Sequence, residues 1–228
     1  MLLFKRLCDI CDGENKSIGR ICSKCRNAVE NHTKLRKCLK CGRLIPINSE
    51  SICHECIRDN YHFDIAISVY PYKNDFKEAL LRFKFKGEFF RVKAFSKLMT
   101  EALKKYKIQV DYMVPVPTKL NKLAEKGYNP PLEMGYLMSR PLGVKIIPQG
   151  LLKTGKTAQQ STLNEAERRK NVKDAYAVNK IHTGKFKGKQ ILLIDDVLTT
   201  GSTVSECAKI LKEAGAAAVY VVTFLIAE

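Results

Sequence analysis

The sequence has no uninterrupted apolar run of about 18 residues, the length a helix needs to span a bilayer. Its longest mainly apolar stretch, Ala216 to Ala227, is shorter and rich in Val, which indicates a buried strand. At the start of the chain only three apolar residues follow Met1 before Lys5 and Arg6, too few for the apolar region of a signal peptide. We therefore expect a cytoplasmic protein.

Acidic residues are scarce: 23 Asp and Glu stand against 40 Lys and Arg, a formal net charge of +17. Most of the excess falls after residue 62. Such a charge suits an anionic partner such as nucleic acid or a phosphorylated substrate, although a Lys-rich solvated surface would give the same count. With 45% hydrophobic residues over 228 positions, the chain is long and apolar enough for one or two folded domains.

Cysteine is almost absent after residue 56, where Cys207 stands alone. The other eight form four Cys-x-x-Cys pairs: Cys8/Cys11, Cys22/Cys25, Cys38/Cys41 and Cys53/Cys56. A secreted protein would use them for disulfides, but without a signal peptide the pattern predicts metal ligation in a reducing compartment.

The spacing predicts two structural Zn²⁺ ions, each closed by two consecutive pairs, because four thiolates complete a tetrahedral site. Interleaved pairing is possible but needs longer crossings. We therefore predict a double zinc ribbon over residues 1–62 that needs metal to fold, and a second domain over 63–228 whose ligand binding survives loss of a cysteine. His32, His54 and His62 are predicted to be surface residues, because eight thiols already supply the ligands.

The second domain alternates strand and helix patterns, which predicts an α/β fold with a mostly parallel sheet. Strands are predicted over 65–70, 110–116, 144–147, 176–178, 191–194 and 218–224. Helices are predicted around 76–83 and 95–106, after Pro130, and over 204–214.

The segment 191–203 carries the most informative pattern: four apolar residues, then Asp195 and Asp196, then a loop of small and hydroxylated residues before a helix. Ligands of open parallel sheets bind at the carboxyl ends of strands. Successive N–H groups at a helix N-terminus bind phosphate, and the two carboxylates could accept from vicinal hydroxyls or hold Mg²⁺. A ribose 5-phosphate fits this description. The predicted loop residues are Leu198, Thr199, Thr200, Gly201, Ser202 and Thr203.

This segment resembles the binding fingerprint of type I phosphoribosyltransferases, which bind phosphoribosyl pyrophosphate (PRPP) with Mg²⁺. Val114-Pro-Val-Pro117 and Lys126-Gly-Tyr-Asn129 resemble the pyrophosphate loop of that fold, and segment 157–176 resembles the loop that closes over the site. With the zinc-ribbon pattern, this order is similar to the ComF family of competence proteins, in particular ComFC-like ones. The family has Arg-Gly-Phe-Asn-Gln where this chain has Lys126-Gly-Tyr-Asn-Pro130.

The resemblance implies a role in DNA uptake and natural transformation, with single-stranded DNA, PRPP and the ATP-driven DNA translocase of the competence machinery as partners. The alternative is an active phosphoribosyltransferase with an unidentified nucleobase or amine acceptor. Such an enzyme works mainly by positioning and by neutralising the leaving pyrophosphate. The candidate catalytic residues are Asp195, Asp196, Lys119, Arg168 and Arg169. The three cations could equally be solvated surface charges.

Segment 73–107 combines eleven basic residues with aromatic ones, a composition that suits single-stranded DNA. Its helical period predicts a core position for four of the rings: Phe76, Phe83, Phe95 and Tyr106. Phe85 and Phe89 are off that period and are predicted near the surface or the site. Lys84, Phe85 and Lys86 are therefore the predicted DNA contacts.

Overall fold

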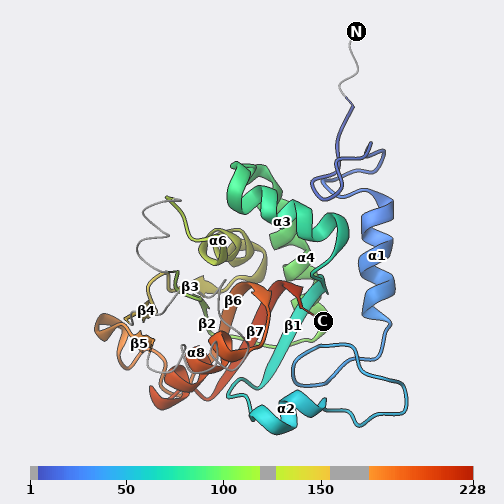
Figure 1. Cartoon of the computed structure of the whole chain (residues 1–228). Coiled ribbons are helices and arrows are strands. Elements are labelled where there is room, and N and C mark those ends of the chain that lie inside the picture. The colour runs from blue at the N-terminus through green and yellow to red at the C-terminus, as the bar shows by residue number, and fades with distance from the viewer. Residues whose placement is uncertain (1–4, 119–126, 155–174, 228) are drawn as a thin grey trace.

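The computed structural model describes residues 5–118, 127–154 and 175–227 and has a five-stranded sheet at its centre (Figure 1). The strand order is β1-β7-β6-β2-β3, and every pairing in this sheet is parallel. The strands are β1 (Ile65–Pro71), β2 (Tyr112–Pro115), β3 (Lys145–Ile146), β6 (Gln190–Leu198) and β7 (Ala218–Ile226). The predicted α/β class is confirmed, and each strand falls on a segment predicted to form one.

Helices cover both faces of the sheet. Successive residues of a strand point to opposite faces, so neighbouring residues of β6 enter different cores. Leu192 and Ile194 of β6 belong to the core that includes α3 (Asn74–Lys86), α4 (Val92–Lys105) and α6 (Pro130–Leu142). Ile191 and Leu193 belong to the opposite core, which includes α8 (Ser202–Glu213). Burial on both faces explains why β6 begins as a continuous apolar run rather than an alternating one.

One predicted strand lies outside the main sheet. β5 (Tyr176–Val178) pairs antiparallel with β4 (Leu151–Lys153) in a separate two-stranded sheet. Leu151 and Tyr176 are buried in the core that contains α8. The apolar pattern at 176–178 thus predicted a strand correctly, but a three-residue strand does not encode its partner.

The N-terminal residues form two cysteine clusters, one on each side of the sheet. The last cysteine of the first cluster (Cys8, Cys11, Cys22 and Cys25) lies in the first turn of α1 (Ser23–Thr33), and the last cysteine of the second (Cys38, Cys41, Cys53 and Cys56) lies in the first turn of α2 (His54–Asp59). α1 packs beside the edge strand β1 (Figure 1). The clusters contribute cysteines to the two cores of the sheet rather than forming a core of their own.

Arg91 joins the first cluster to the helical layer. It belongs to the short 3-10 helix η1 (Phe89–Arg91), and its side chain is fully buried. Its guanidinium donates to the Asp9 carbonyl at 2.7 Å, to Asp12 Oδ1 at 2.6 Å and to Glu88 Oε2 at 2.5 Å. Arg82 of α3 also pairs with Asp12. Buried charges of this kind are tolerated only when paired, so these contacts fix the first cluster against the end of α3.

Two sequence predictions about burial are wrong. His32 is 5% exposed rather than a surface residue, and its ring lies edge-on to Tyr70 with centroids 5.4 Å apart. Burial, with the nearby charges of Lys37 and Lys73, lowers the pKa of His32 to about 4. Tyr106 is 48% exposed because α4 ends at Lys105, so the helical period that predicted a core position no longer applies.

No helix in the described ranges is both long and apolar enough to cross a membrane. The longest helix that the structure describes, α4, has 14 residues. This agrees with the sequence, which has no apolar run long enough to span a bilayer.

Candidate functional site

The paired carboxylates lie near the carboxyl end of β6, in the middle of the sheet between β7 and β2. Both residues are mostly but not fully buried, and the Asp196 N–H donates to Asp195 Oδ1 at 2.8 Å. This is the edge of an open parallel sheet at which ligands bind. The structure therefore brings Asp195 and Asp196 to the place that a ribose-binding role requires.

Two lysines from other elements face this carboxylate pair. Lys84 Nζ, at the end of α3, lies 2.6 Å from Asp196 Oδ2, and both side chains are mostly buried. Lys153 of β4 donates to the Tyr176 hydroxyl at 2.9 Å. Burial and the charge of Asp196 raise the pKa of Asp195 to about 7, against the opposing effects of Lys84 and Lys153. The site thus combines two carboxylates and two cations in partly dehydrated surroundings.

The raised pKa of Asp195 predicts a pH-dependent stability. The unfolded carboxyl ionises near pH 3.8 and the folded one near 7, so ionisation opposes folding in this window. The contribution of Asp195 to the free energy of unfolding therefore falls as the pH rises from about 4 to about 7. We expect Asp195→Asn to remove this slope in urea unfolding between about pH 5.5 and 7.5.

Asp111→Asn is a matched control for the pH measurement. Asp111 accepts hydrogen bonds from Gln190 N and Lys189 at the opposite end of β6, and these contacts lower its pKa. The control should keep the slope of the parent protein. An Asp195→Asn variant with the same slope as the parent would contradict the assignment of this pH dependence to Asp195.

The turn between β6 and α8 contains the residues predicted to bind phosphate, Leu198 to Thr203, and is called the phosphate turn below. Gly201 has a φ of +80°, in the left-handed region that favours glycine. Thr200 Oγ1 lies 2.9 Å from Ser202 Oγ and accepts from the Ser202 N–H at 3.4 Å. α8 begins at Ser202, so the unpaired N–H groups of its first turn and its dipole favour an anion here.

A second turn lies at the neighbouring strand, where β2 ends. Thr118 Oγ1 donates to Asn129 Oδ1 at 2.8 Å, and Asn129 Nδ2 donates to the Val116 carbonyl at 3.3 Å. Asn129 directly precedes α6, whose first residue is Pro130. These contacts join the two segments that resemble a pyrophosphate loop.

Tyr128 gives a physical account of one departure from the ComF pattern. Its hydroxyl donates to the Phe83 carbonyl at 2.7 Å, with the Lys84 carbonyl at 3.2 Å. A phenylalanine at this position could not make this contact. Tyr128 therefore fixes the last turn of α3, the helix that brings Lys84 to Asp196.

The remaining predicted residues fall into three groups. Lys119, Arg168 and Arg169 lie outside the described residues. Phe85 and Lys86 are exposed, and the prediction that Phe85 and Phe89 lie near the surface is confirmed by exposures of 68% and 49%. Lys84, in contrast, pairs with Asp196 inside the candidate site.

Sequence reasoning missed Lys153 as a site residue and placed Tyr176 only at the end of the segment that resembles the closing loop. Tyr176 is 5% exposed, interacts with Thr203 of the phosphate turn, and its pKa is raised mainly by burial. Nothing in the local pattern around 153 marks that lysine, because its approach to the site depends on the pairing of β4 with β5. The available signal for Lys153 was a polar residue opposite a short strand, and this is weak evidence for a site residue.

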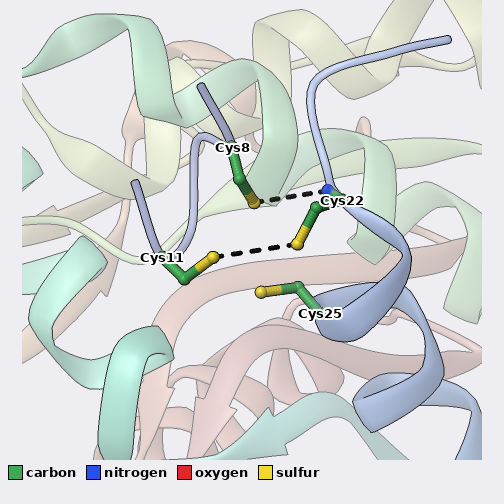
Figure 2. A group of neighbouring side chains, drawn as sticks. All are labelled: Cys8, Cys11, Cys22 and Cys25. Atoms are coloured by element: carbon green, nitrogen blue, oxygen red, sulfur yellow. Dashed lines mark hydrogen bonds between the residues drawn. The ribbon is translucent and has the colours of Figure 1, made fainter. Parts of the chain in front are cut away.

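The two cysteine clusters fit a tetrahedral metal. In each, the four sulfur atoms lie within 4.8 Å of one another. Figure 2 shows the four side chains of the first cluster gathered around one point. The distances from Cys11 to Cys22, Cys38 to Cys56 and Cys41 to Cys53 are 3.7, 3.7 and 3.6 Å between sulfurs. Zn–S bonds of about 2.3 Å in a tetrahedron give a separation of about 3.8 Å, far longer than a disulfide. The described geometry therefore supports consecutive rather than interleaved pairing.

Backbone groups support the same thiols as anions. The Cys22 N–H donates to Cys8 Sγ at 3.3 Å, and the Cys53 N–H donates to Cys38 Sγ at the same distance. Zinc ligands bind as thiolates, so this donor set suits Zn²⁺ in closed, structural sites.

The fold and the site define a phosphoribosyltransferase-like α/β domain. Residues 152–227 match the family model of the phosphoribosyl transferase domain, a range that includes β4 to β7 and the acid pair. The match begins well after the cysteine clusters and covers β6 and β7 of the main sheet but not β1, β2 or β3, so it describes the C-terminal part of the chain alone.

Comparison of whole chains extends the similarity to the cysteine clusters. The chain is 25% identical to competence protein F of Haemophilus influenzae, over 94% of both chains. It is 27% identical to competence protein ComFC of Bacillus subtilis, over 95% of this chain and 92% of the relative. It is 29% identical to the DNA utilization protein YhgH of Escherichia coli, over 88% of both. The resemblance to ComF-type proteins predicted from the sequence is therefore confirmed over nearly the whole chain.

Proposed function

We propose that this protein is an accessory factor of DNA uptake and natural transformation that binds single-stranded DNA and carries a PRPP site. Similarity to competence and DNA utilization proteins supports the competence-related role. The observation that carries the PRPP site is the acid pair of β6 beside the phosphate turn at the start of α8. Calorimetric titration with PRPP and Mg²⁺ tests it, and absence of binding would refute it.

Each part of the site has a role in this proposal. The turn residues Leu198 to Thr203 hold the 5-phosphate, and Asp195 and Asp196 accept from the ribose hydroxyls. Carboxylate oxygens are ligands that Mg²⁺ prefers, so the acid pair also fits the ion that accompanies PRPP. When bound, Mg²⁺ neutralises charge on the pyrophosphate. Lys84 pairs with Asp196 and adds positive charge at the same edge of the sheet.

The second candidate function is an active phosphoribosyltransferase. The bond from ribose C1 to the pyrophosphate oxygen would break, its electron pair leaving with pyrophosphate, while an acceptor nitrogen bonds to C1 and releases a proton. The cations near the acid pair favour such a departure. Lys119, Arg168 and Arg169 remain proposed contributors. Steady pyrophosphate release with one acceptor from a nucleobase and amine screen would establish turnover, and binding without release would favour the accessory role.

We also propose that the protein is cytoplasmic, that residues 1–62 and 63–228 are its two functional parts, and that it works with an ATP-driven DNA translocase. The named roles of the competence relatives support this partnership. Co-purification with the translocase from competent cells would test the partnership.

The exposed end of α3 leads to a prediction about DNA. Lys86 and Phe85 are exposed, and a cation beside an exposed ring is the combination with which proteins contact a nucleic-acid backbone and a base. We expect Lys86→Glu to weaken single-strand binding and to reduce the salt slope by about 0.7 for each phosphate that is no longer neutralised. Phe85→Ala should weaken binding by removing a stacked ring, worth about 1–3 kcal/mol, without changing the slope. Fluorescence anisotropy over a salt series measures both effects.

Lys145→Glu provides the matched control, because Lys145 is an exposed lysine at the start of β3. It should bind DNA nearly as the parent does. Lys84→Glu is expected to act differently, impairing PRPP binding because Lys84 pairs with Asp196. Parent-like DNA binding by both the Lys86 and Phe85 variants would place the DNA path elsewhere.

A further inference from the structure

The phosphate turn is held from behind by two side chains that lie far from it in the sequence. Tyr61, just after α2, donates from its hydroxyl to the Thr200 carbonyl at 2.6 Å. Arg43, two residues after Cys41, donates from its guanidinium to the Thr199 carbonyl and from Nε to the Ala227 carbonyl at 3.3 Å. The second cysteine cluster and its flanks therefore contact two consecutive peptide groups of the turn.

Fixing a carbonyl also fixes the N–H on the opposite side of the same peptide plane. The described peptide bonds are trans, and in a trans peptide the C=O and the following N–H point in opposite directions. Holding the Thr199 and Thr200 carbonyls toward Arg43 and Tyr61 thus directs the Thr200 and Gly201 N–H groups away from them. Those two N–H groups belong to the turn that would bind phosphate.

Tyr61 is well suited to this role. It is 6% exposed, and its ring stacks on Phe63 with centroids 5.1 Å apart. Burial raises the pKa of Tyr61 to about 12, so the hydroxyl keeps its proton and remains a donor at neutral pH. The ring also lies against Gly201, where an added Cβ would come within 3.1 Å of it. The turn and the tyrosine therefore fit each other closely.

We propose that Arg43 and Tyr61 are positioning residues that preorganise the 199–201 turn for the phosphate monoester of a phosphorylated ribose. This inference rests on the proposed PRPP site and assigns part of its affinity to residues outside the strand–turn–helix. Preorganised donors do not have to be ordered when the ligand binds, so replacing the residues that hold them weakens binding while every donor to the ligand remains.

The test uses the full-length, metal-replete protein and three probes: PRPP with Mg²⁺, ribose 5-phosphate, and inorganic pyrophosphate. Tyr61→Phe removes one hydroxyl and keeps the ring, and Arg43→Lys keeps the charge but loses the planar fork. We expect each variant to bind PRPP and ribose 5-phosphate about 3- to 10-fold more weakly, the range of one net hydrogen bond. Pyrophosphate binding, which does not use this turn, should be unchanged.

Tyr220→Phe is the matched control, since the Tyr220 hydroxyl bonds to Gln190 at the opposite end of the sheet, at 3.3 Å. It should leave all three affinities unchanged. A general structural defect in Tyr61→Phe would weaken ribose 5-phosphate and pyrophosphate equally and would overturn the proposal, as would parent-like affinity in both variants. If the parent itself binds neither PRPP nor ribose 5-phosphate, the proposed function fails first, and this inference fails with it.

Discussion

Replacing both Asp195 and Asp196 with asparagine is expected to abolish the stabilisation of the protein by PRPP and Mg²⁺. Each carboxylate that accepts from a ribose hydroxyl or binds the ion contributes a charge-assisted interaction of about 1.5–3 kcal/mol. Losing two of them predicts an affinity loss of roughly 100-fold or more. A ligand that binds the folded state raises its stability by mass action, so the thermal shift should vanish at ligand concentrations that saturate the parent.

The unliganded double variant should still fold. Burial already opposes the ionised form of Asp195, so asparagine removes a destabilising charge. Replacing Asp196 also removes the carboxylate partner of Lys84. Normal metal content and a cooperative unfolding transition without ligand would separate lost binding from a lost fold. Asp111→Asn, at the opposite end of β6, should keep the PRPP shift.

A full thermal shift in the double variant would mean that the acid pair does not bind PRPP. The phosphate turn could then still hold an anion, because its donors are backbone groups. Titration with ribose 5-phosphate would distinguish this case, since it tests the turn without the pyrophosphate.

The sheet and the phosphate turn were predictable because their signals are local. Four apolar residues, two carboxylates and a glycine stand in consecutive order at 191–201, and the strand, the acid pair and the turn follow that order. The cysteine pairs were predictable for the same reason, because the spacing within a Cys-x-x-Cys pair is a property of a short segment.

The wrong or missing predictions depend on contacts between distant segments. The pairing of Lys84 with Asp196 was missing from the sequence analysis, which used the neighbours of Lys84 in α3 to predict a DNA contact that stays a prediction. His32 lacks an apolar pattern around it and is buried by Tyr70 of β1. Arg43 and Tyr61 carry no signal at all in the sequence, because their function depends on where the phosphate turn lies.

The second prediction with a large expected effect is that the two cysteine clusters differ in how strongly they influence the phosphate turn. The sequence predicted that loss of a cysteine would spare ligand binding by the sheet. For the second cluster we expect weaker ligand binding instead. Arg43 and Tyr61 contact the phosphate turn, and the segments that carry these two residues are anchored by Cys41 and Cys56. Cys41→Ser is therefore expected to lose one of two bound zinc ions and to weaken ribose 5-phosphate binding at least 10-fold, the combined effect of two missing hydrogen bonds.

Cys25→Ser is the matched comparison in the first cluster. It should also lose one zinc ion, and it should loosen the packing of Asp12 on Arg82 and Arg91. Those contacts support α3 and Lys84 rather than the phosphate turn, so we expect a lower unfolding temperature but ribose 5-phosphate affinity within about threefold of the parent. Metal analysis, thermal unfolding and calorimetry on the same preparations measure all three quantities.

The two variants can be compared directly, because both remove one thiolate from a closed four-sulfur site. Equal losses of ribose 5-phosphate affinity would mean that metal loss acts through general destabilisation of the shared cores. Unchanged affinity in Cys41→Ser would mean that Arg43 and Tyr61 keep their places without the ion. Only a selective loss in Cys41→Ser fits a phosphate turn whose conformation is held by the second cluster, through hydrogen bonds to the carbonyls of Thr199 and Thr200.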